Sequence, residues 1–192
     1  MVEWADGMVW LNPPAAGTAM AEGLAVTTGD QTDFWRGTFY DFYRDDGHFL
    51  HCPATGDFSA ELRFTGDYRA LYDQAGLMLR ANATHWVKAG VEFTDGVMHF
   101  SVVVTNGMSD WSVLALPGWS GPLTLRLSRH GDAVRVQYRD AGGAWRLVRL
   151  AWFPPELAVE VGPMCCSPTR AGFQVVFHDF ALGPPIARDL HA

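Results

Sequence analysis

The sequence predicts an all-β fold, a sandwich of two antiparallel sheets, and three observations lead to this prediction. Apolar side chains alternate with polar or small ones in short segments, as they do in strands that are buried on one face. Turn-forming residues separate these segments, and no long stretch has the apolar spacing of a helix. Aromatic residues, which are common in strands, make up 13% of the 192 residues.

The alternating segments follow one another at short intervals along most of the chain. They are residues 57–65, 74–80, 86–93, 99–105, 123–128, 134–139 and 173–177. Asp95-Gly96 and Gly131-Asp132 each lie between two such segments and are typical of tight β-hairpin turns. Closely spaced strands joined by turns favour an antiparallel sandwich or barrel, here as one domain over residues 1–192. The first 20 residues and the tail after Gly183 depart from the pattern, and we expect irregular extensions at both ends.

Charge and cysteine content restrict the classes of partner and the compartment. The net charge of −7 disfavours a nucleic-acid-binding protein, which usually has a basic surface. No apolar run is long enough to span a membrane, and residues 1–6 do not begin a secretory signal. Cys52 and the adjacent Cys165 and Cys166 make a poor disulfide framework, so we expect reduced thiols and a cytoplasmic protein. In an extended chain Cys165 and Cys166 point to opposite faces, one into the core and the other near the surface.

A set of ordered motifs resembles a known family. The motifs are Trp10-Leu11-Asn12-Pro13-Pro14, Thr32-Asp33-Phe34-Trp35-Arg36, Asp46-Gly47-His48-Phe49, Tyr72-Asp73-Gln74-Ala75-Gly76-Leu77-Met78-Leu79-Arg80, Trp86-Val87-Lys88-Ala89-Gly90-Val91-Glu92, Ser109-Asp110-Trp111-Ser112 and Cys166-Ser167-Pro168. Over about residues 10–182 they resemble the concanavalin A-like family of unknown function that includes the yeast "regulation of enolase" protein. The resemblance implies a jelly-roll sandwich, similar to legume lectins and to the C-terminal sandwich of some family 43 glycoside hydrolases. It implies no known reaction.

The alternation of side chains along neighbouring strands places a candidate ligand site on one outward sheet face. If Leu77, Val87 and Val91 face the core, the opposite face presents a different set of side chains. These side chains are Gln74, Arg80, Trp86, Lys88 and Glu92. We expect the indole to stack on a sugar or small acid, the cations to pair with an anionic group, and Gly76 and Gly90 to leave space. A solvated face with ion pairs among Lys88, Glu92 and Arg80 is the alternative.

Trp35 and His48 are placed at the margin of this site. Asp33-Phe34-Trp35-Arg36 and the segment around His48 bring an acid, an indole and an imidazole toward the same sheet. His48 and Cys52 share strand parity, but two ligands make only half of a metal site. We therefore expect packing or ligand contact here, and neither a metal nor a cofactor.

The favoured function is non-catalytic binding of a carbohydrate or small polar metabolite. One alternative is a protein-interaction module, as a monomer or a homodimer, that acts on a metabolic enzyme. We expect Trp111 at the rim of the site or in the seal of a dimer, and Trp119 in the edge packing of the sandwich. A sugar-active hydrolase is a second alternative, for which Glu61 and Glu92 are the carboxylate pair to consider. The carboxylate motif of sandwich glucanases and the Gly-x-Ser-x-Gly elbow are absent from the sequence. Arg170 is a possible ligand contact from a loop.

Overall fold

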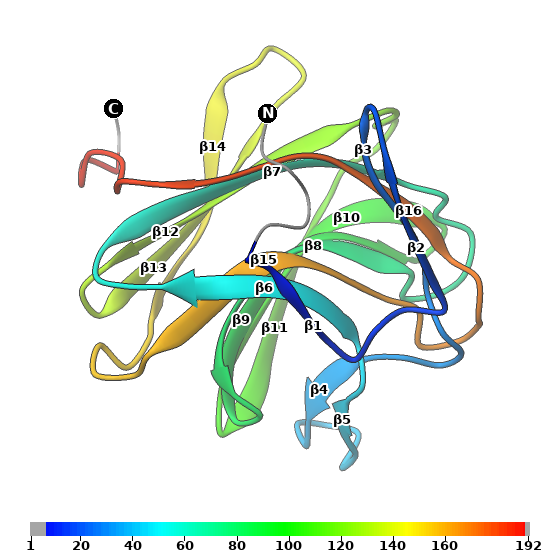
Figure 1. The fold of residues 1–192 in the computed structure, drawn as a ribbon, viewed down its shortest axis with the longest axis horizontal. Helices are drawn as coiled ribbons and strands as arrows, with labels where there is room; N and C mark the ends of the chain where they lie inside the picture. The colour runs from blue at the N-terminus through cyan, green and yellow to red at the C-terminus, as the bar shows by residue number, and fades with distance from the viewer. Residues whose placement is uncertain (1–6, 191–192) are drawn as a thin grey trace.

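A computed structural model describes residues 7–190 as two seven-stranded antiparallel sheets packed face to face (Figure 1). In order across the sheet, sheet A contains β1 (Val9–Leu11), β6 (His48–Ala54), β15 (Val159–Cys166), β8 (Gln74–Asn82), β9 (His85–Thr94), β10 (Val97–Asn106) and β11 (Met108–Ala115). Sheet B contains β14 (Trp145–Trp152), β13 (Ala133–Arg139), β12 (Leu123–His130), β7 (Phe58–Gly66), β16 (Gln174–Gly183), β3 (Gly23–Thr27) and β2 (Ala16–Met20). A small hairpin, β4 (Phe34–Arg36) and β5 (Tyr43–Asp45), projects beside sheet A. The predicted all-β sandwich is confirmed.

Each alternating segment of the sequence corresponds to a strand of the sandwich. They form β7, β8, β9, β10, β12, β13 and β16. Asp95 and Gly96 both have positive φ, at 54° and 75°, as a two-residue turn between β9 and β10 requires. No helix in residues 7–190 is long and apolar enough to cross a membrane.

Strand β15 was not predicted, because its sequence lacks the alternation of a half-buried strand. Cys165 packs in the core between the sheets, while Met164 and Cys166 pack on the other side of sheet A. A strand that is buried on both faces has apolar residues at successive positions. Pro163 also argues against a central strand, because proline has no N–H for the ladder.

The ends of the chain are more ordered than the sequence suggests. The first 20 residues contribute the edge strands β1 and β2, so the expectation of an irregular N-terminal segment is wrong for these residues. Residues 1–6, where the secretory signal was judged absent, lie outside the described residues. The C-terminal tail does lack strands through residue 190, but Arg135 on β13 donates hydrogen bonds to the carbonyls of Ala187 and Asp189.

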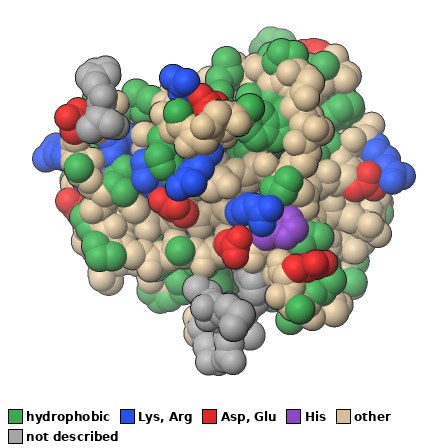
Figure 2. Space-filling model, turned by 90° about the horizontal axis from the view of Figure 1, so that it is seen from above, with side chains coloured by type: hydrophobic (Ala, Val, Ile, Leu, Met, Phe, Trp, Pro, Cys, Tyr) green, Lys and Arg blue, Asp and Glu red, His purple; other side chains and the backbone are tan. Residues whose placement is uncertain are grey.

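The main core lies between the inner faces of the two sheets. Sheet A contributes side chains such as Leu77, Val87 and Phe100, and sheet B contributes Leu62 and Phe177, all without exposed surface. On the outer face drawn in Figure 2, acidic and basic side chains lie beside one another. Exposed ion pairs such as those in this mixed surface contribute about 0–1 kcal/mol each, so the stability of the sandwich comes mainly from apolar burial.

A second, smaller core covers the outer face of sheet A. The segment that carries β4 and β5 lies over this face, and Phe34 packs at 6.2 Å from the ring of Trp86. Its buried members are Phe34, Trp35, Phe49, Met78, Trp86, Val103, Met164 and Cys166. This corrects the expectation of an open outward face. It also explains why Cys166 is as fully buried as Cys165 and does not lie near the surface.

Two glycines allow β8 and β9 to approach closely beneath this second core. Gly76 and Gly90 are directly paired across the two strands. A Cβ atom on Gly90 would lie 2.0 Å from the carbonyl oxygen of Ala75, and one on Gly76 would lie 2.0 Å from that of Ala89. Both positions therefore require glycine, because any side chain would collide with the backbone of the paired strand. This role is more than leaving room for a ligand.

A buried carboxylate joins the loop before β8 to the loop after β15. Asp73 has no exposed surface, and its oxygens accept hydrogen bonds at 2.6 Å from both Ser167 Oγ and Arg170 Nη2. The backbone N–H groups of Arg69 and Ala70 donate to the same carboxylate. Burial alone raises the pKa of Asp73, but the hydrogen bonds from Arg170 and Ser167 outweigh it and lower the pKa overall.

This cluster has a consequence for one sequence-based expectation, the ligand contact of Arg170. Arg170 is engaged by Asp73 and by the carbonyl of Asp67, so the structure does not make it a ligand contact. Ser167 is likewise a donor to Asp73. The cluster instead fixes the loops that hold Tyr72 and Thr169.

Substituting Gly90 tests the close approach of β8 and β9. We expect Gly90→Ala to reduce the free energy of unfolding by about 1–3 kcal/mol or more, because the new methyl group collides with rigid backbone. Urea denaturation followed by tryptophan fluorescence measures the change. Gly183→Ala is the matched control, since a Cβ atom there meets nothing within 4 Å. Equal stability of the two variants would contradict the analysis.

Substituting Asp73 tests the buried cluster and its pH dependence. We expect Asp73→Ala to lower the free energy of unfolding by about 3 kcal/mol at pH 7, because Arg170 and two backbone N–H groups lose their acceptor. Since the folded state lowers the pKa of Asp73, its stabilisation is present above the ordinary carboxyl pKa of about 3.9 and is lost as the pH falls through the folded-state pKa.

The difference between wild type and Asp73→Ala should therefore shrink in urea titrations carried out at about pH 3. Asp67→Ala removes an exposed carboxylate that pairs with Arg69, and it should change stability by less than about 0.5 kcal/mol. A difference for Asp73→Ala that is the same at both pH values would show that the ionised carboxylate is not the stabilising form.

Candidate functional site

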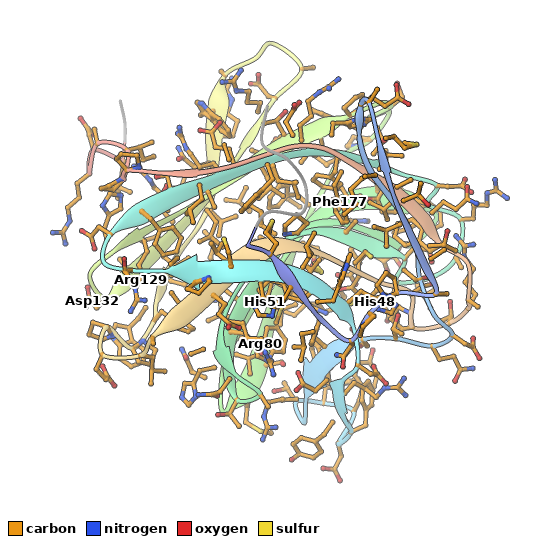
Figure 3. All side chains as sticks on the ribbon, viewed as in Figure 1. His48, His51, Arg80, Arg129, Asp132 and Phe177 are labelled. Atoms are coloured by element: carbon orange, nitrogen blue, oxygen red, sulfur yellow. The ribbon has the colours of Figure 1, made fainter. Side chains whose placement is uncertain are left out.

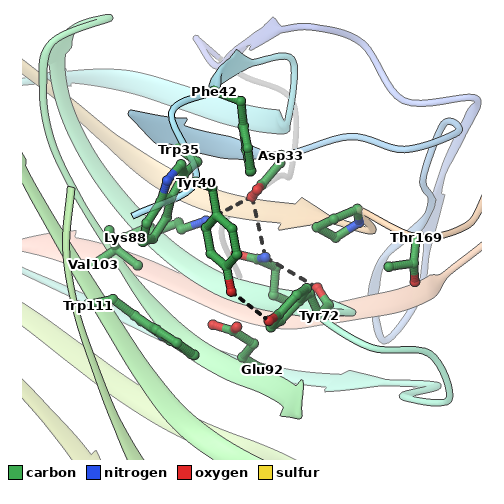
Figure 4. Close-up of a pocket in the computed structure, with 12 residues that line it drawn as sticks. Asp33, Trp35, Tyr40, Phe42, Tyr72, Lys88, Glu92, Val103, Trp111 and Thr169 are labelled. Atoms are coloured by element: carbon green, nitrogen blue, oxygen red, sulfur yellow. Dashed lines mark hydrogen bonds and ion pairs between the residues drawn. The ribbon is translucent and has the colours of Figure 1, made fainter. Parts of the chain in front are cut away.

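The described residues enclose a cavity of about 280 Å³ between the outer face of sheet A and the β4–β5 segment (Figure 4). Strands β8 to β11 form its floor, and three loop segments form its walls. The lining residues are Asp33, Trp35, Tyr40, Phe42, Tyr72, Gln74, Lys88, Glu92, Val103, Trp111, Pro168 and Thr169. Five of these side chains are aromatic, which is the composition expected of a pocket that binds an organic ligand.

Lys88 and Asp33 form a buried ion pair on one side of the cavity. Lys88 Nζ lies 3.1 Å from Asp33 Oδ1, and the two side chains are only 4% and 13% exposed. Asp33 Oδ1 also accepts a hydrogen bond from the backbone N–H of Phe34, which fixes the carboxylate at the start of β4. Burial alone lowers the pKa of Lys88, but the negative charges of Asp33 and Glu92 outweigh it, and the pKa is raised. Lys88 is therefore a permanent cation.

Glu92 lies on the same strand face, four residues beyond Lys88. It is 5% exposed, beside the hydroxyl of Ser101 and the indole of Trp111. Trp111 Nε1 in turn donates a hydrogen bond of 3.0 Å to Ser101 Oγ. Burial raises the pKa of Glu92, and the charge of Lys88 only partly offsets this effect. The protonated form of Glu92 is thus more accessible than that of an ordinary surface carboxyl.

Two tyrosines close one side of the cavity. The hydroxyl groups of Tyr40 and Tyr72 lie 3.4 Å apart, and Figure 4 shows them meeting in front of the floor. The hydrogen bond to Tyr40, followed by burial, raises the pKa of Tyr72 to about 12, so its phenol stays protonated. Tyr72 also has a φ of 66°, a left-handed conformation that costs a bulky residue about 1–2 kcal/mol. Strained residues of this kind cluster at functional sites.

Four of the seven predicted site residues line the cavity. Gln74, Lys88 and Glu92 come from the floor strands, and Trp35 comes from β4. Gln74 Nε2 donates to the carbonyl of Tyr72 at 3.2 Å, and Trp35 Nε1 donates to the carbonyl of Thr38 at 3.1 Å. The proposed convergence of these four side chains agrees with the structure.

The other three predicted residues do not reach the cavity. Both Nη atoms of Arg80 bind the carboxylate of Asp45, at 2.9 and 2.8 Å, so Arg80 is not available for a ligand anion. Trp86 has no exposed surface and lies in the second core. The expected alternative, a solvated face with ion pairs among Lys88, Glu92 and Arg80, is also not formed, because Lys88 pairs with Asp33 and Arg80 with Asp45 of the covering segment.

His48 is directed to the other side of sheet A. It pairs across strands with Cys165, which packs in the main core, whereas the neighbouring Phe49 packs in the second core. His48 Nε2 accepts from the N–H of Gly29 at 2.9 Å, and Nδ1 donates to the carbonyl of Asn12 at 2.7 Å. Figure 3 labels His48 and His51 along β6. Burial lowers the pKa of His48, consistent with a neutral, structural imidazole.

One further hypothesis fails for a geometric reason. Glu61 projects from sheet B, where Arg126 binds it, and Glu92 projects from sheet A, so these carboxylates lie on opposite outer faces of the sandwich. In residues 7–190, no group of three or more His, Cys, Asp and Glu side chains converges as a metal site would require. Trp119 packs against the main core near Tyr138, as predicted for edge packing.

Sequence reasoning missed much of the cavity wall. Asp33 and Trp111 were considered only as neighbours or rim residues, and the tyrosines and Phe42 were not considered at all. The dense aromatic run Phe39-Tyr40-Asp41-Phe42-Tyr43 is an identifiable pattern, because its spacing fits neither a half-buried strand nor a helix. Trp111, expected at a site rim or a dimer seal, lies on strand β11 and lines the cavity.

Comparison with known proteins identifies relatives along almost the whole chain. The family model "Protein of unknown function (DUF1349)" matches residues 10–185. "Regulation of enolase protein 1" of Saccharomyces cerevisiae is 43% identical over 182 residues, which cover 95% of this chain and 92% of the yeast protein. A crystal structure of a functionally unknown protein from Saccharomyces cerevisiae superimposes with a TM-score of 0.89 at 42% identity, covering 94% of this chain and 98% of that chain.

More distant structures share the sandwich only. The GH43 protein BlXynB from Bacillus licheniformis matches with a TM-score of 0.67 at 16% identity, covering 92% of this chain and 36% of that chain. A match at this identity shows a shared fold only, and it does not identify any functional residue in this chain. The family match and the yeast relative together establish that the chain belongs to the DUF1349 family, whose function is unknown.

Proposed function

We propose that the protein binds a carbohydrate or a polar metabolite of similar size in the cavity over sheet A, without transforming it. The observation that carries this proposal is the enclosed aromatic cavity with the Lys88–Asp33 pair buried in its wall. Aromatic faces stack on apolar ligand surfaces, and a few fixed polar groups orient the ligand.

The protonation states of Lys88 and Tyr72 favour binding over catalysis by a neutral amine nucleophile or a phenolate base. Lys88 has a raised pKa, which disfavours the neutral amine that a nucleophile requires. Tyr72 has a pKa of about 12 and is a poor general base at neutral pH. We also propose a cytoplasmic location, since Cys52, Cys165 and Cys166 are all free thiols.

Substituting Trp111 tests the binding site. A ligand at about 100 times its dissociation constant stabilises the protein by roughly 2.7 kcal/mol, which is a rise in Tm of about 5–10 °C. We expect a screen of sugars, sugar phosphates and small organic acids to identify such a ligand. Trp111→Ala should weaken its binding about tenfold, since the ring face is lost.

Trp152→Ala is the control for this substitution, because Trp152 is 58% exposed on β14 and does not line the cavity. Isothermal titration calorimetry on both variants measures the affinities. Unchanged affinity in Trp111→Ala, or an equal loss in both variants, would exclude this cavity as the binding site.

A second candidate function is regulation of a metabolic enzyme through a protein contact. Two observations favour it. The name of the yeast relative refers to regulation of enolase, and the β4–β5 hairpin presents Phe39, which is 93% exposed, and Tyr43, which is 55% exposed. Large exposed aromatic side chains are typical of protein-binding surfaces.

Substituting Phe39 tests this second function. With enolase purified from the same organism, we expect surface plasmon resonance to detect a complex that Phe39→Ser weakens at least tenfold. Leu150→Ser is the control, since Leu150 is also an exposed apolar residue, at 50%, but lies on β14. Sedimentation velocity of the protein alone separates a homodimer from a complex with the enzyme. Absence of binding, or equal weakening by both substitutions, would count against a contact through this loop.

A further inference from the structure

The charges and shape of the cavity restrict the ligand further than the proposed function does. We infer that the cavity takes one uncharged sugar ring, as a free monosaccharide or as the terminal residue of an oligosaccharide, and rejects sugar phosphates and sugar acids. This inference rests on the proposed function.

The first argument is that no positive charge is left to pair with an anion. Lys88 is the one basic residue among the described residues that line the cavity, where Asp33 and Glu92 are acidic. The ammonium group is already 3.1 Å from Asp33 Oδ1. Arg80, on the same sheet face, is held by Asp45 outside the cavity. A phosphate or carboxylate would be buried beside acidic groups without a free cation, which is unfavourable.

The second argument is the supply of hydrogen-bonding groups for hydroxyls. Within residues 7–190, the only acceptor within hydrogen-bond distance of Lys88 Nζ is Asp33 Oδ1, so the ammonium retains donors. Gln74 uses its amide N–H groups for Tyr72 and Asp33, and its carbonyl oxygen has no partner among the same residues. A sugar hydroxyl both donates and accepts, so it can use donors and acceptors placed side by side.

The third argument is size and closure. The volume of about 280 Å³ lies just below the range of pockets for drug-sized ligands, which is roughly 300–1,000 Å³. The contact between Tyr40 and Tyr72 closes one side, so a polysaccharide cannot pass through the cavity. Trp35 and Trp111 supply apolar surfaces for the C–H face of a ring. A single ring, entering end-on, fits these limits.

Matched ligand sets test the inference. Calorimetry compares neutral hexoses and pentoses with the corresponding phosphates and uronic acids, and with short oligosaccharides that carry the same sugar at the non-reducing end. We expect at least one neutral sugar to bind, and its phosphate and uronate to bind at least tenfold more weakly. A phosphate or uronate that binds as tightly as the neutral sugar overturns this inference and leaves the proposed function intact. No binding by any compound overturns the proposed function itself.

Two further comparisons in the same experiment test the size argument and distinguish a free monosaccharide from the terminal residue of an oligosaccharide. Binding of free sugars together with weak binding of oligosaccharides assigns the site to monosaccharides. Equal binding of both assigns it to chain ends. Tight binding that requires several consecutive sugar residues overturns the single-ring assignment.

A charge variant tests the first argument directly. Asp33→Asn keeps an oxygen for the N–H of Phe34 but removes the negative charge that is hydrogen-bonded to Lys88. We expect the preference for the neutral sugar over its phosphate to fall at least tenfold. Asp45→Asn is the matched control, because it removes the carboxylate partner of Arg80 outside the cavity, and it should leave the preference unchanged. An unchanged preference in Asp33→Asn overturns charge compensation as the basis of selectivity.

Discussion

The ion pair between Lys88 and Asp33 connects the two parts of the structure on which the candidate site depends. Lys88 belongs to the central strand β9, and Asp33 precedes β4 in the segment that covers sheet A. A buried ion pair contributes little net stability when compared with apolar residues of the same volume, because both charges lose their hydration. The ion pair instead determines where the covering segment lies, because it fixes the register of this segment on the sheet. That register places Trp35, Tyr40 and Phe42 around the cavity.

The second core explains how such a pair can be buried on the outside of a sandwich. Most outward faces of antiparallel sheets are solvated, but here Phe34, Trp86 and Cys166 have no exposed surface. Burial of each large aromatic side chain contributes about 1.5–3 kcal/mol, which offsets the cost of ordering the covering segment. Asp73, with its hydrogen bonds from Ser167 and Arg170, holds the loops at the other end of the cavity.

The chemistry of the site follows from this burial. The side chains that face the cavity are held in protonation states that suit hydrogen bonding: a charged ammonium, a protonated phenol, and a carboxyl whose pKa is raised by burial. The family has no established function, and the yeast relative is named for regulation of enolase. The cavity adjoins an exposed aromatic loop, and this arrangement provides a physical basis for both proposed functions, because the β4–β5 segment contributes to each.

The sequence by itself determined the all-β class, most central strands, the β9–β10 hairpin turn, and the parity that puts Gln74, Lys88 and Glu92 on one face. These features depend on local alternation and turn geometry, which neighbouring residues encode. Tertiary structure alone decided that this face is covered, that Asp45 binds Arg80, and that His48 faces the other way. Those outcomes depend on contacts between residues such as Asp33 and Lys88, which lie far apart in the chain and whose pairing no local pattern specifies.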